Sequence, residues 1–326
     1  MGSERSVGAG LGLALLSAAT FGTSGTFARS LIDAGWSADA AVAARVGVAA
    51  LILAVPALLA LRGRWSVAGR SLGDVGLFGL LAVAGAQVGF FNAVRYLPVG
   101  VALLLEYSGI VLVVLWMWVR HGERPRGLTV AGAAAAVVGL ALVLDIGGGG
   151  AEIDPLGVVW GLVAAVGLAA YFVLSARVDP RLPSIALACG GMAFGAIVLV
   201  LLGTVGAMPM RATFGTVVLA GHTTSWMVPI AGLVLLAAVV AYVTGIAAAR
   251  VLGAALSSFA GLTEVLFAVV IAWLVLGELP SATQAVGGAF IVSGIALVRL
   301  DQLRHPARPP GDDDPAATSS LARQQR

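Results

Sequence analysis

Apolar residues occur in long, nearly uninterrupted runs along this chain, and polar residues gather in the short gaps between them. The runs lack the strict apolar–polar alternation of a half-buried strand, and they are long enough for helices. A helix needs about 20 apolar residues to cross the hydrocarbon core of a bilayer. The pattern therefore predicts ten membrane-spanning helices, at residues 11–32, 39–61, 74–94, 98–119, 127–146, 156–176, 183–203, 227–249, 253–276 and 282–300.

Glycine and proline mark many of the gaps. Tyr96-Leu97-Pro98 predicts a tight turn between the third and fourth helices, and Asp179-Pro180-Arg181 separates the sixth from the seventh. The glycine run 147–150 with Glu152 and Asp154 predicts an acidic linker. The expected organisation is an N-terminal segment (1–10), a first five-helix repeat (11–146), the linker (147–155), a second five-helix repeat (156–300) and a disordered tail (301–326).

Residues 95–143 and 250–298 repeat each other at a constant offset of 155 residues, without a gap. Five helices per repeat is an odd number, so the second repeat is expected upside down relative to the first. Inverted repeats of this kind are typical of transporters that hold their substrate where the repeats meet. The register pairs Arg95 with Arg250, Leu97 with Leu252, Trp118 with Trp273, Glu123 with Glu278, Gly132 with Gly287, and Gly139 with Gly294.

The composition requires lipid as the solvent of this chain. Its 326 residues are 60% hydrophobic and only 11% charged, whereas a soluble domain carries about 25% charged residues. In lipid only helices and closed barrels satisfy their backbone, so the expected fold class is an all-α membrane protein. The single cysteine, Cys189, rules out an intramolecular disulfide.

All 19 basic residues are arginine, which, with the many alanines and glycines, is typical of a GC-rich bacterial genome. If the N-terminus is cytoplasmic, fifteen of them fall in inside regions, and the outside loops hold only Arg95 and Arg211. This bias is the positive-inside rule. We therefore expect a multi-pass protein of the cell membrane with both termini cytoplasmic, and its basic charge indicates topology rather than nucleic-acid binding.

Three ionisable residues fall inside the expected helices: Arg45, Glu106 and Glu264. At 1.5 Å per residue, Glu106 lies about 13 Å and Glu264 about 18 Å deep, both near mid-membrane. In the repeat register they differ by three residues, so both occupy the same face of corresponding helices. Such residues suggest function by default, and we interpret both carboxylates as cavity or proton-coupling groups. The alternative is a structural role at a helix break.

Arg45 is expected either to pair with Glu106 or Asp39, or to bind a substrate carboxylate. Other polar and aromatic residues at membrane depth complete the predicted substrate site, and core packing is the alternative for each. The predicted substrate-binding residues are Thr20, Thr23, Ser24, Arg45, Gln87, Phe91, Asn92, Glu106, Tyr107, Tyr171, Tyr242, Ser257 and Ser258, with Glu264 and Glu106 for proton coupling.

Enzyme chemistry finds little support in the sequence. Gly22-Thr23-Ser24-Gly25 resembles the serine motif of intramembrane proteases, but His121, His222 and His305 all fall in loops or the tail. The chain has no phosphate-binding loop, metal-ligand cluster or redox cysteine pair. We therefore expect no enzyme activity, no cofactor, no metal and no direct ATP drive.

Several short motifs mark the two repeats: Tyr96-Leu97-Pro98, Leu104-Leu105-Glu106-Tyr107 and Gly122-Glu123-Arg124 in the first, and Leu262-Thr263-Glu264 and Leu276-Gly277-Glu278 in the second. In these motifs the chain resembles the EamA-type drug/metabolite transporters, over about residues 10–300. The resemblance implies ten helices in two inverted repeats around a central cavity, with alternating access. Family members usually have prolines where this chain has Ile110 and Val265. Their loss predicts that the fourth and ninth helices are straighter than the family pattern.

The function that fits these observations is secondary active export of amino acids or related small metabolites, with proton coupling as the expected drive. The alternatives are efflux of lipophilic cations, which Arg45 disfavours because it would repel them, and a passive channel. The expected partners are a small-molecule substrate and membrane lipid, with no nucleic acid. The oligomeric state stays open, with a homodimer as one option.

Overall fold

The computed structural model describes residues 2–97, 99–122, 124–144, 154–276 and 281–304. The expected linker, most of the tail, and Pro98, Glu123 and Glu278 lie outside these residues. Helix accounts for 82% of the described residues, in agreement with the expected all-α membrane class. Within these described residues, eight helices are long and apolar enough to cross a membrane: Val7–Asp33, Ala38–Ala60, Leu72–Ala93, Val101–Arg120, Pro155–Arg177, Ser184–Thr204, Met227–Gly261 and Ala282–Asp301. Two further apolar helices, Gly127–Val143 and Thr263–Val275, are shorter.

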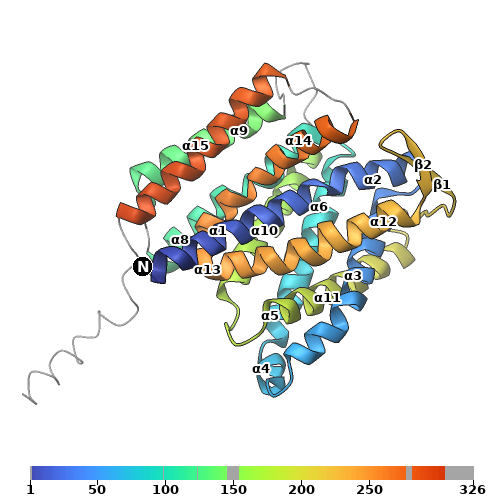
Figure 1. Cartoon of the computed structure of the whole chain (residues 1–326), viewed down its shortest axis with the longest axis horizontal. Helices are drawn as coiled ribbons and strands as arrows, with labels where there is room; N and C mark the ends of the chain where they lie inside the picture. The colour runs from blue at the N-terminus through green and yellow to red at the C-terminus, as the bar shows by residue number, and fades with distance from the viewer. Residues whose placement is uncertain (1, 98, 123, 145–153, 277–280, 305–326) are drawn as a thin grey trace, which may run out of the picture.

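Several of these helices are divided into shorter elements (Figure 1). The elements are α1 (Gly2–Gly22), α2 (Ser24–Asp33), α3 (Ala38–Ala60), α4 (Trp65–Arg70), α5 (Leu72–Phe78), η1 (Gly79–Gly85), α6 (Ala86–Ala93), α7 (Val99–Tyr107), α8 (Gly109–His121), α9 (Gly127–Val143), α10 (Pro155–Arg177), α11 (Ser184–Thr204), β1 (Thr216–Leu219), β2 (His222–Ser225), α12 (Met227–Val234), η2 (Leu235–Val240), α13 (Ala241–Gly261), α14 (Thr263–Leu276) and α15 (Ala282–Arg304).

Local sequence explains where many helices begin and end. Asp154 accepts a hydrogen bond from the backbone N–H of Leu156, just before a helix that starts with proline. Ser281 and Gln284 bond each other's backbone N–H groups in a capping box at the start of α15. Gly122 ends α8 with a left-handed φ of 70°, which glycine adopts without steric cost.

The repeat is visible in local backbone geometry. Two stretches of π-helix, η1 (79–85) and η2 (235–240), interrupt α-helices in the two halves. The offset of 155 residues found in the sequence carries residues 80–85 onto 235–240. The correspondence between the halves therefore extends N-terminally beyond the residues whose identities repeat.

The fourth and ninth expected helices are each divided by a break beside the acid, although neither has the proline that family members usually carry there. Ser108 separates α7 from α8, and its hydroxyl donates a 2.5 Å hydrogen bond to the Leu105 carbonyl. Thr263, 155 residues later, begins α14 and donates a 2.7 Å bond to the Ala260 carbonyl. Hydroxyl groups that bond the preceding turn of a helix weaken and bend it. A further kink lies at Gly253, whose φ of 77° and ψ of 166° divide α13.

Helices of one half pack against their counterparts in the other. In α9 and α15, a Cβ added to Gly132 would lie 2.8 Å from the Gly294 carbonyl oxygen, and one added to Gly139 would lie 2.6 Å from that of Gly287. The low-numbered glycine of each helix meets the high-numbered glycine of the other, so the two helices are antiparallel. Glycine at such a crossing lets the backbones approach closely.

The other helix contacts show the same exchange between halves. α3 packs on α11, α1 packs on α13 and α14, and α10 packs on α6, α7 and α8 (Figure 1). Each contact made by α1 with the second half thus has a counterpart made by α10 with the first half. The helices enclose a space between the two halves instead of forming two separate bundles.

A small antiparallel hairpin of β1 and β2 lies between α11 and α12, which the all-helical expectation did not include. Ala220 and Gly221 form its turn with φ values of 52° and 75°, the left-handed pair of a tight hairpin. Nearby, Trp36 donates its indole N–H to the Thr213 carbonyl at 2.6 Å and meets the Phe214 ring edge to face. We call this end of the molecule the hairpin end.

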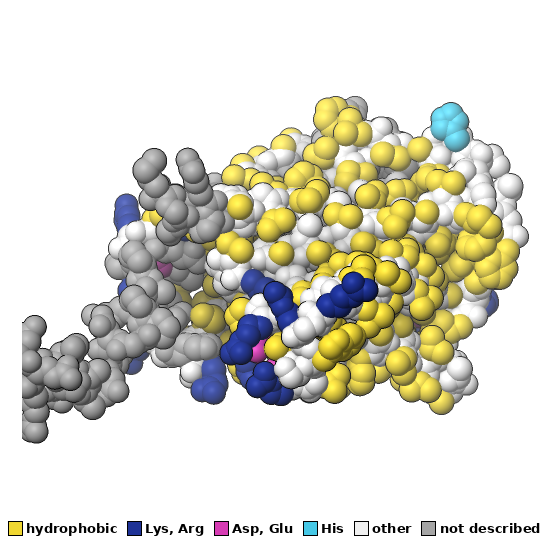
Figure 2. Space-filling view, turned by 60° about the horizontal axis from the view of Figure 1, so that its bottom comes forward, with side chains coloured by type: hydrophobic (Ala, Val, Ile, Leu, Met, Phe, Trp, Pro, Cys, Tyr) yellow, Lys and Arg dark blue, Asp and Glu magenta, His cyan; other side chains and the backbone are white. Residues whose placement is uncertain are grey.

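The surface between the two ends is apolar. Leu51 is 74% exposed, Val55 64% and Ile197 58%. Figure 2 shows hydrophobic side chains over much of the visible side, with arginines gathered toward one end. An apolar surface of this extent is what a lipid-facing protein presents, so the protein is a multi-pass membrane protein.

Candidate functional site

A cavity of about 1010 Å³ lies between the two halves. Most of its wall comes from α1, α2, α3, α6, α7, α10, α13 and α14, with single residues from η1, α9, α12 and α15. Near the hairpin end it reaches the exposed side chains of Arg29 and Ile32, at the end of α2. At its other extreme it is bounded by Ala248 and Ser257, only 1% and 2% exposed. The cavity is therefore open at the hairpin end and closed at the opposite end.

Four aromatic side chains close the inner end of the cavity, and we call them the aromatic floor: Phe21, Tyr171, Phe172 and Tyr242. The Tyr171 ring lies 5.0 Å from that of Phe172 and 5.6 Å from that of Tyr242, edge to face in both pairs. Phe21 meets Tyr242 at 5.2 Å. Edge-to-face aromatic contacts of this kind are favourable beyond the area that they bury, so the floor is a packed closure.

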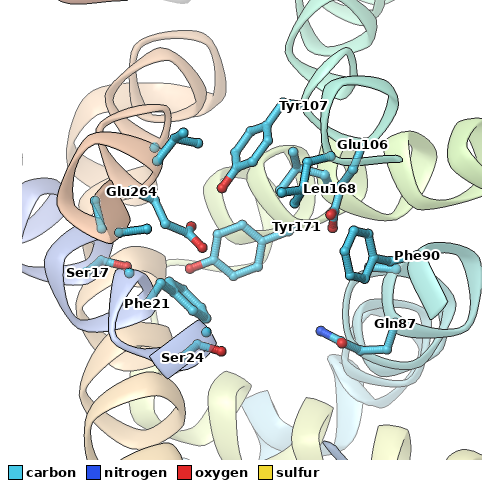
Figure 3. Close-up of a pocket in the computed structure, with 18 of the residues that line it drawn as sticks. Ser17, Phe21, Ser24, Gln87, Phe90, Glu106, Tyr107, Leu168, Tyr171 and Glu264 are labelled. Atoms are coloured by element: carbon cyan, nitrogen blue, oxygen red, sulfur yellow. The ribbon is translucent and has the colours of Figure 1, made fainter. Parts of the chain in front are cut away.

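The two carboxylates predicted from the sequence both line the cavity. Glu106 lies in the last turn of α7 and Glu264 in the first turn of α14, each beside the helix break described above. Figure 3 shows them on opposite walls, with Tyr107 and Tyr171 between them and the Tyr107 hydroxyl on the side of Glu264. The helix breaks thus bring one acid from each half to the same space.

Arg45 lies in the wall of the cavity and is 6% exposed. Its Nη1 donates a 3.2 Å hydrogen bond to the Ser24 hydroxyl, and its buried Nε has no partner. Its charge acts on both Glu106 and Glu264, although it forms no ion pair among the described residues. A buried guanidinium with unused donors is an open site for an anionic group.

The expected pairing of Arg45 with Glu106 or Asp39 is therefore not found. Asp39 instead meets Arg95, with 3.7 Å between its Oδ2 and the arginine Nη2. Asp39 lies at the start of α3 and Arg95 just after α6. The sequence could not distinguish these pairings, because they depend on which helix ends meet at the hairpin end.

Ten of the fourteen predicted site residues line the cavity. They are Ser24, Arg45, Gln87, Phe91, Glu106, Tyr107, Tyr171, Tyr242, Ser257 and Glu264. The structure brings these residues together from seven helices of both halves. Their roles in binding and coupling stay predictions.

Four predicted residues are outside this lining, and each of them makes a local hydrogen bond. Thr20 donates to the Leu16 carbonyl at 2.8 Å, and Thr23 donates to that of Thr20 at 2.6 Å. Ser258 donates to the Ala255 carbonyl at 2.7 Å. The Asn92 amide donates to the Val88 carbonyl at 2.8 Å, and its oxygen accepts from Arg95. Backbone carbonyls one turn away thus satisfy these donors.

The structure adds Ser17, Phe90, Phe172 and Gln284 to the lining. A signal for Ser17 was present, because Ser17, Phe21 and Ser24 follow the spacing of one helix face. Phe90 likewise lies three residues after Gln87. Gln284 had no such signal, since it lies in the first turn of α15 and reaches the cavity only through tertiary packing. Among the described residues, no group of three His, Cys, Asp or Glu side chains could hold a metal ion.

An apolar helical body around a cavity that carries buried charged groups from both halves is the arrangement of a membrane transporter. The chain belongs to the EamA-like transporter family, whose model matches residues 8–145 and 155–300. The family resemblance stated from the sequence is thereby confirmed, and the match consists of two repeats. Membership of a transporter family also points away from an enzyme.

Individual relatives agree with this assignment. The chain is 25% identical over 230 residues to an uncharacterized transporter of Clostridium kluyveri, covering 69% of this chain and 71% of that protein. A crystal structure with 21% identity superimposes with a TM-score of 0.70 over 93% of this chain and 99% of the other. At that identity the second comparison shows a shared fold alone.

Proposed function

We propose that this membrane protein is a secondary active transporter that exports amino acids or closely related zwitterionic metabolites by alternating access. The observation that carries the proposal is the charge pattern of the cavity. One guanidinium, Arg45, and two carboxylates, Glu106 and Glu264, face the same space without forming ion pairs with one another. A substrate with one negative and one positive group can pair its negative group with Arg45 and its positive group with one of the glutamates, which leaves the second carboxyl available to carry a proton.

The chemistry of each group fits a part of such a substrate. The Arg45 fork can hold the α-carboxylate through two parallel hydrogen bonds, and its unpartnered Nε is available for this purpose. The α-ammonium group then lies toward Glu264 or Glu106. The rings of Phe21, Tyr107 and the rest of the wall provide apolar contact for the side chain.

For the transport cycle we propose ten membrane spans in two inverted five-helix repeats. Gly127–Val143 and Thr263–Val275 serve as the fifth and ninth spans, beside the eight longer helices. The kink at Gly253 divides Met227–Gly261, so that residues 254–261 continue into α14 as part of the ninth span. Support comes from the antiparallel contact of α9 with α15 and from the exchange of α1 and α10 contacts between halves.

We place the hairpin end outside the cell membrane of a bacterium and both termini in the cytoplasm. The arginine bias of the loops supports this orientation. The open cavity would then face outward, the side on which an exporter releases its substrate. Glu264, with Glu106 as a second acid, would take up a proton from outside and release it inside, because alternating access exposes the carboxyl to each side in turn.

Efflux of lipophilic cations is a second candidate, favoured by two carboxylates in an aromatic wall. Arg45 distinguishes the candidates, because a buried guanidinium binds an anionic group and repels a cation. A passive channel would use the same cavity without accumulating substrate.

The test is transport by purified protein in lipid vesicles under an imposed pH gradient. A labelled amino acid mixture and a lipophilic cation such as tetraphenylphosphonium are compared in parallel. We expect amino acids to accumulate against their gradient, and the exposed-loop variant Arg211→Lys to behave like the parent. Accumulation of the cation alone would support the second candidate, and equilibration without accumulation would indicate a channel.

A further inference from the structure

We infer that the mouth of the cavity closes by seating Phe90 of α6 against Ser24 and Gly25 at the start of α2. The inference rests on the proposed alternating access, and it follows from how the opposite end is closed now. There the Tyr171 side chain of α10 lies directly on Gly245 of α13. A Cβ added to Gly245 would overlap the Tyr171 hydroxyl and lie 2.7 Å from the Ser17 hydroxyl oxygen.

Two packing contacts give the correspondence between α1 and α10. A Cβ on Gly10 would lie 2.8 Å from both Val251 and Leu252. A Cβ on Gly157 would lie 2.6 Å from Leu97 and 2.8 Å from Tyr96. The offset of 155 carries residues 96 and 97 onto 251 and 252, so these are the same contact with the halves exchanged. Gly10 and Gly157 are therefore equivalent.

This correspondence identifies the counterpart of the closed contact. Counting from Gly10 and Gly157, Tyr171 of α10 corresponds to Ser24, the first residue of α2. The offset of 155 makes Gly245 of α13 correspond to Phe90 of α6. The contact of Tyr171 with Gly245 at the floor is thus matched at the mouth by the pair Ser24 and Phe90. At the floor the bulky side chain is on the first helix of the pair, and at the mouth it is on the second.

The mouth pair is apart in this structure. Both residues line the cavity, and Figure 3 shows them on opposite walls with open space between Ser24 and the Phe90–Gln87 side. A Cβ added to Gly25, the residue after Ser24, would have nothing within 4 Å. Inverted repeats take the same pair of conformations in alternation. When the floor opens, α2 and α6 should adopt the present spacing of α10 and α13, which places the Phe90 ring on Ser24 and Gly25.

The test uses Gly25→Phe, which fills the space that Phe90 would occupy on α2; in the present conformation a Cβ at this position meets nothing within 4 Å. Its matched control is Gly12→Phe on α1, where an added Cβ also meets nothing within 4 Å. The reporter is the cavity residue Ala28 replaced by cysteine, in a Cys189→Ala background. A membrane-impermeant thiol reagent added on the mouth side measures how often the mouth is open, with no substrate present.

We expect Gly25→Phe to label several-fold faster than the parent and to lose roughly tenfold or more of its transport, because overpacking excludes the closed mouth. Gly12→Phe should match the parent in both. The inference is overturned if Gly25→Phe transports like Gly12→Phe, or if its labelling rate equals that of the parent. If Gly25→Phe does not fold, Phe90→Ala decides the question: faster labelling supports the gate, and unchanged labelling overturns it.

The labelling measurement also separates this inference from the proposed function. Faster labelling in Gly25→Phe together with no amino acid transport by the parent would support closure of the mouth by Phe90 and reject amino acids as the substrate class. Normal amino acid export by a folded Gly25→Phe would keep the substrate class and reject the gate.

Discussion

The helix break between α7 and α8 and the break between α13 and α14 occupy equivalent places in the two repeats, yet they hold their acids on opposite sides. Glu106 precedes Ser108 and ends a helix, whereas Glu264 follows Thr263 and begins one. The N-terminus of a helix stabilises negative charge and the C-terminus disfavours it. The two repeats therefore share a helix break beside the acid, but they place the acid at opposite ends of a helix. On this basis we assign the proposed proton coupling to Glu264 first, with Glu106 as the second acid.

The comparison of the two breaks assumes that the second repeat is inverted in the membrane relative to the first. Inversion predicts the largest difference between equivalent positions of the two repeats. Arg124→Cys and Leu279→Cys occupy equivalent positions of the two repeats and should react from opposite faces of the membrane. An impermeant thiol reagent applied outside intact cells should label the second and not the first, in a Cys189→Ala background. Labelling of both from the same side would contradict the inverted arrangement.

The next prediction concerns Glu264→Gln, which imitates a permanently protonated carboxyl. It should abolish accumulation driven by a pH gradient and preserve substrate exchange at equal pH, because the cavity keeps its shape. Glu106→Gln is the matched variant, and we expect it to retain part of the gradient-driven accumulation. Flux into vesicles with and without a pH gradient measures both variants. Gradient-driven accumulation by Glu264→Gln at the parental level would reassign the coupling site.

Arg45→Lys tests whether the site between the two acids recognises a carboxylate. Lysine keeps the charge that acts on both glutamates but loses the planar fork. We expect transport of amino acids to fall about tenfold, the value of one lost charge-assisted hydrogen bond. The yield of folded protein after detergent extraction should be unchanged. Loss of folded protein would show that Arg45 has a structural role instead.

The smallest effects are expected at the breaks themselves. Ser108→Ala and Thr263→Ala each remove a hydroxyl that bonds the preceding turn, which should straighten the helix and displace the neighbouring acid. We expect each to slow transport roughly two- to fivefold, since a single hydrogen bond contributes about 1 kcal/mol. Transport rates of the two single variants measure this. A large effect in one and none in the other would show that the breaks are not equivalent devices.

Part of this protein follows from its sequence alone. The length and apolarity of the runs require membrane-spanning helices. The backbone hydrogen bonds of a helix lie within the helix, and its apolar side chains can face lipid directly, so neither depends on the rest of the fold. The repeat of residues 95–143 in 250–298 and the family resemblance are likewise properties of the linear chain. The depth of Glu106 and Glu264 follows from counting along a helix, and the structure places both at the cavity.

Other features were decided only by tertiary packing. Hydroxyl groups at membrane depth suggested site residues at Thr20, Thr23 and Ser258. A hydroxyl in a helix can also bond the backbone of that helix, as these three do, and the sequence does not reveal which hydroxyls face a cavity. Arg45 met Ser24 instead of an acid because partner choice depends on how helices from distant segments pack.

The same holds for the state of the cavity. The breaks at Ser108 and Thr263 arise without proline, from side chains whose preference is weak in isolation. The closed floor depends on Tyr171 meeting Gly245, two residues that are 74 positions apart and carry no mutual signal in the chain. Hydrophobic pattern and length are local and survive in the sequence, whereas side-chain partners and the open end of a cavity are relations between helices, which only the folded structure fixes.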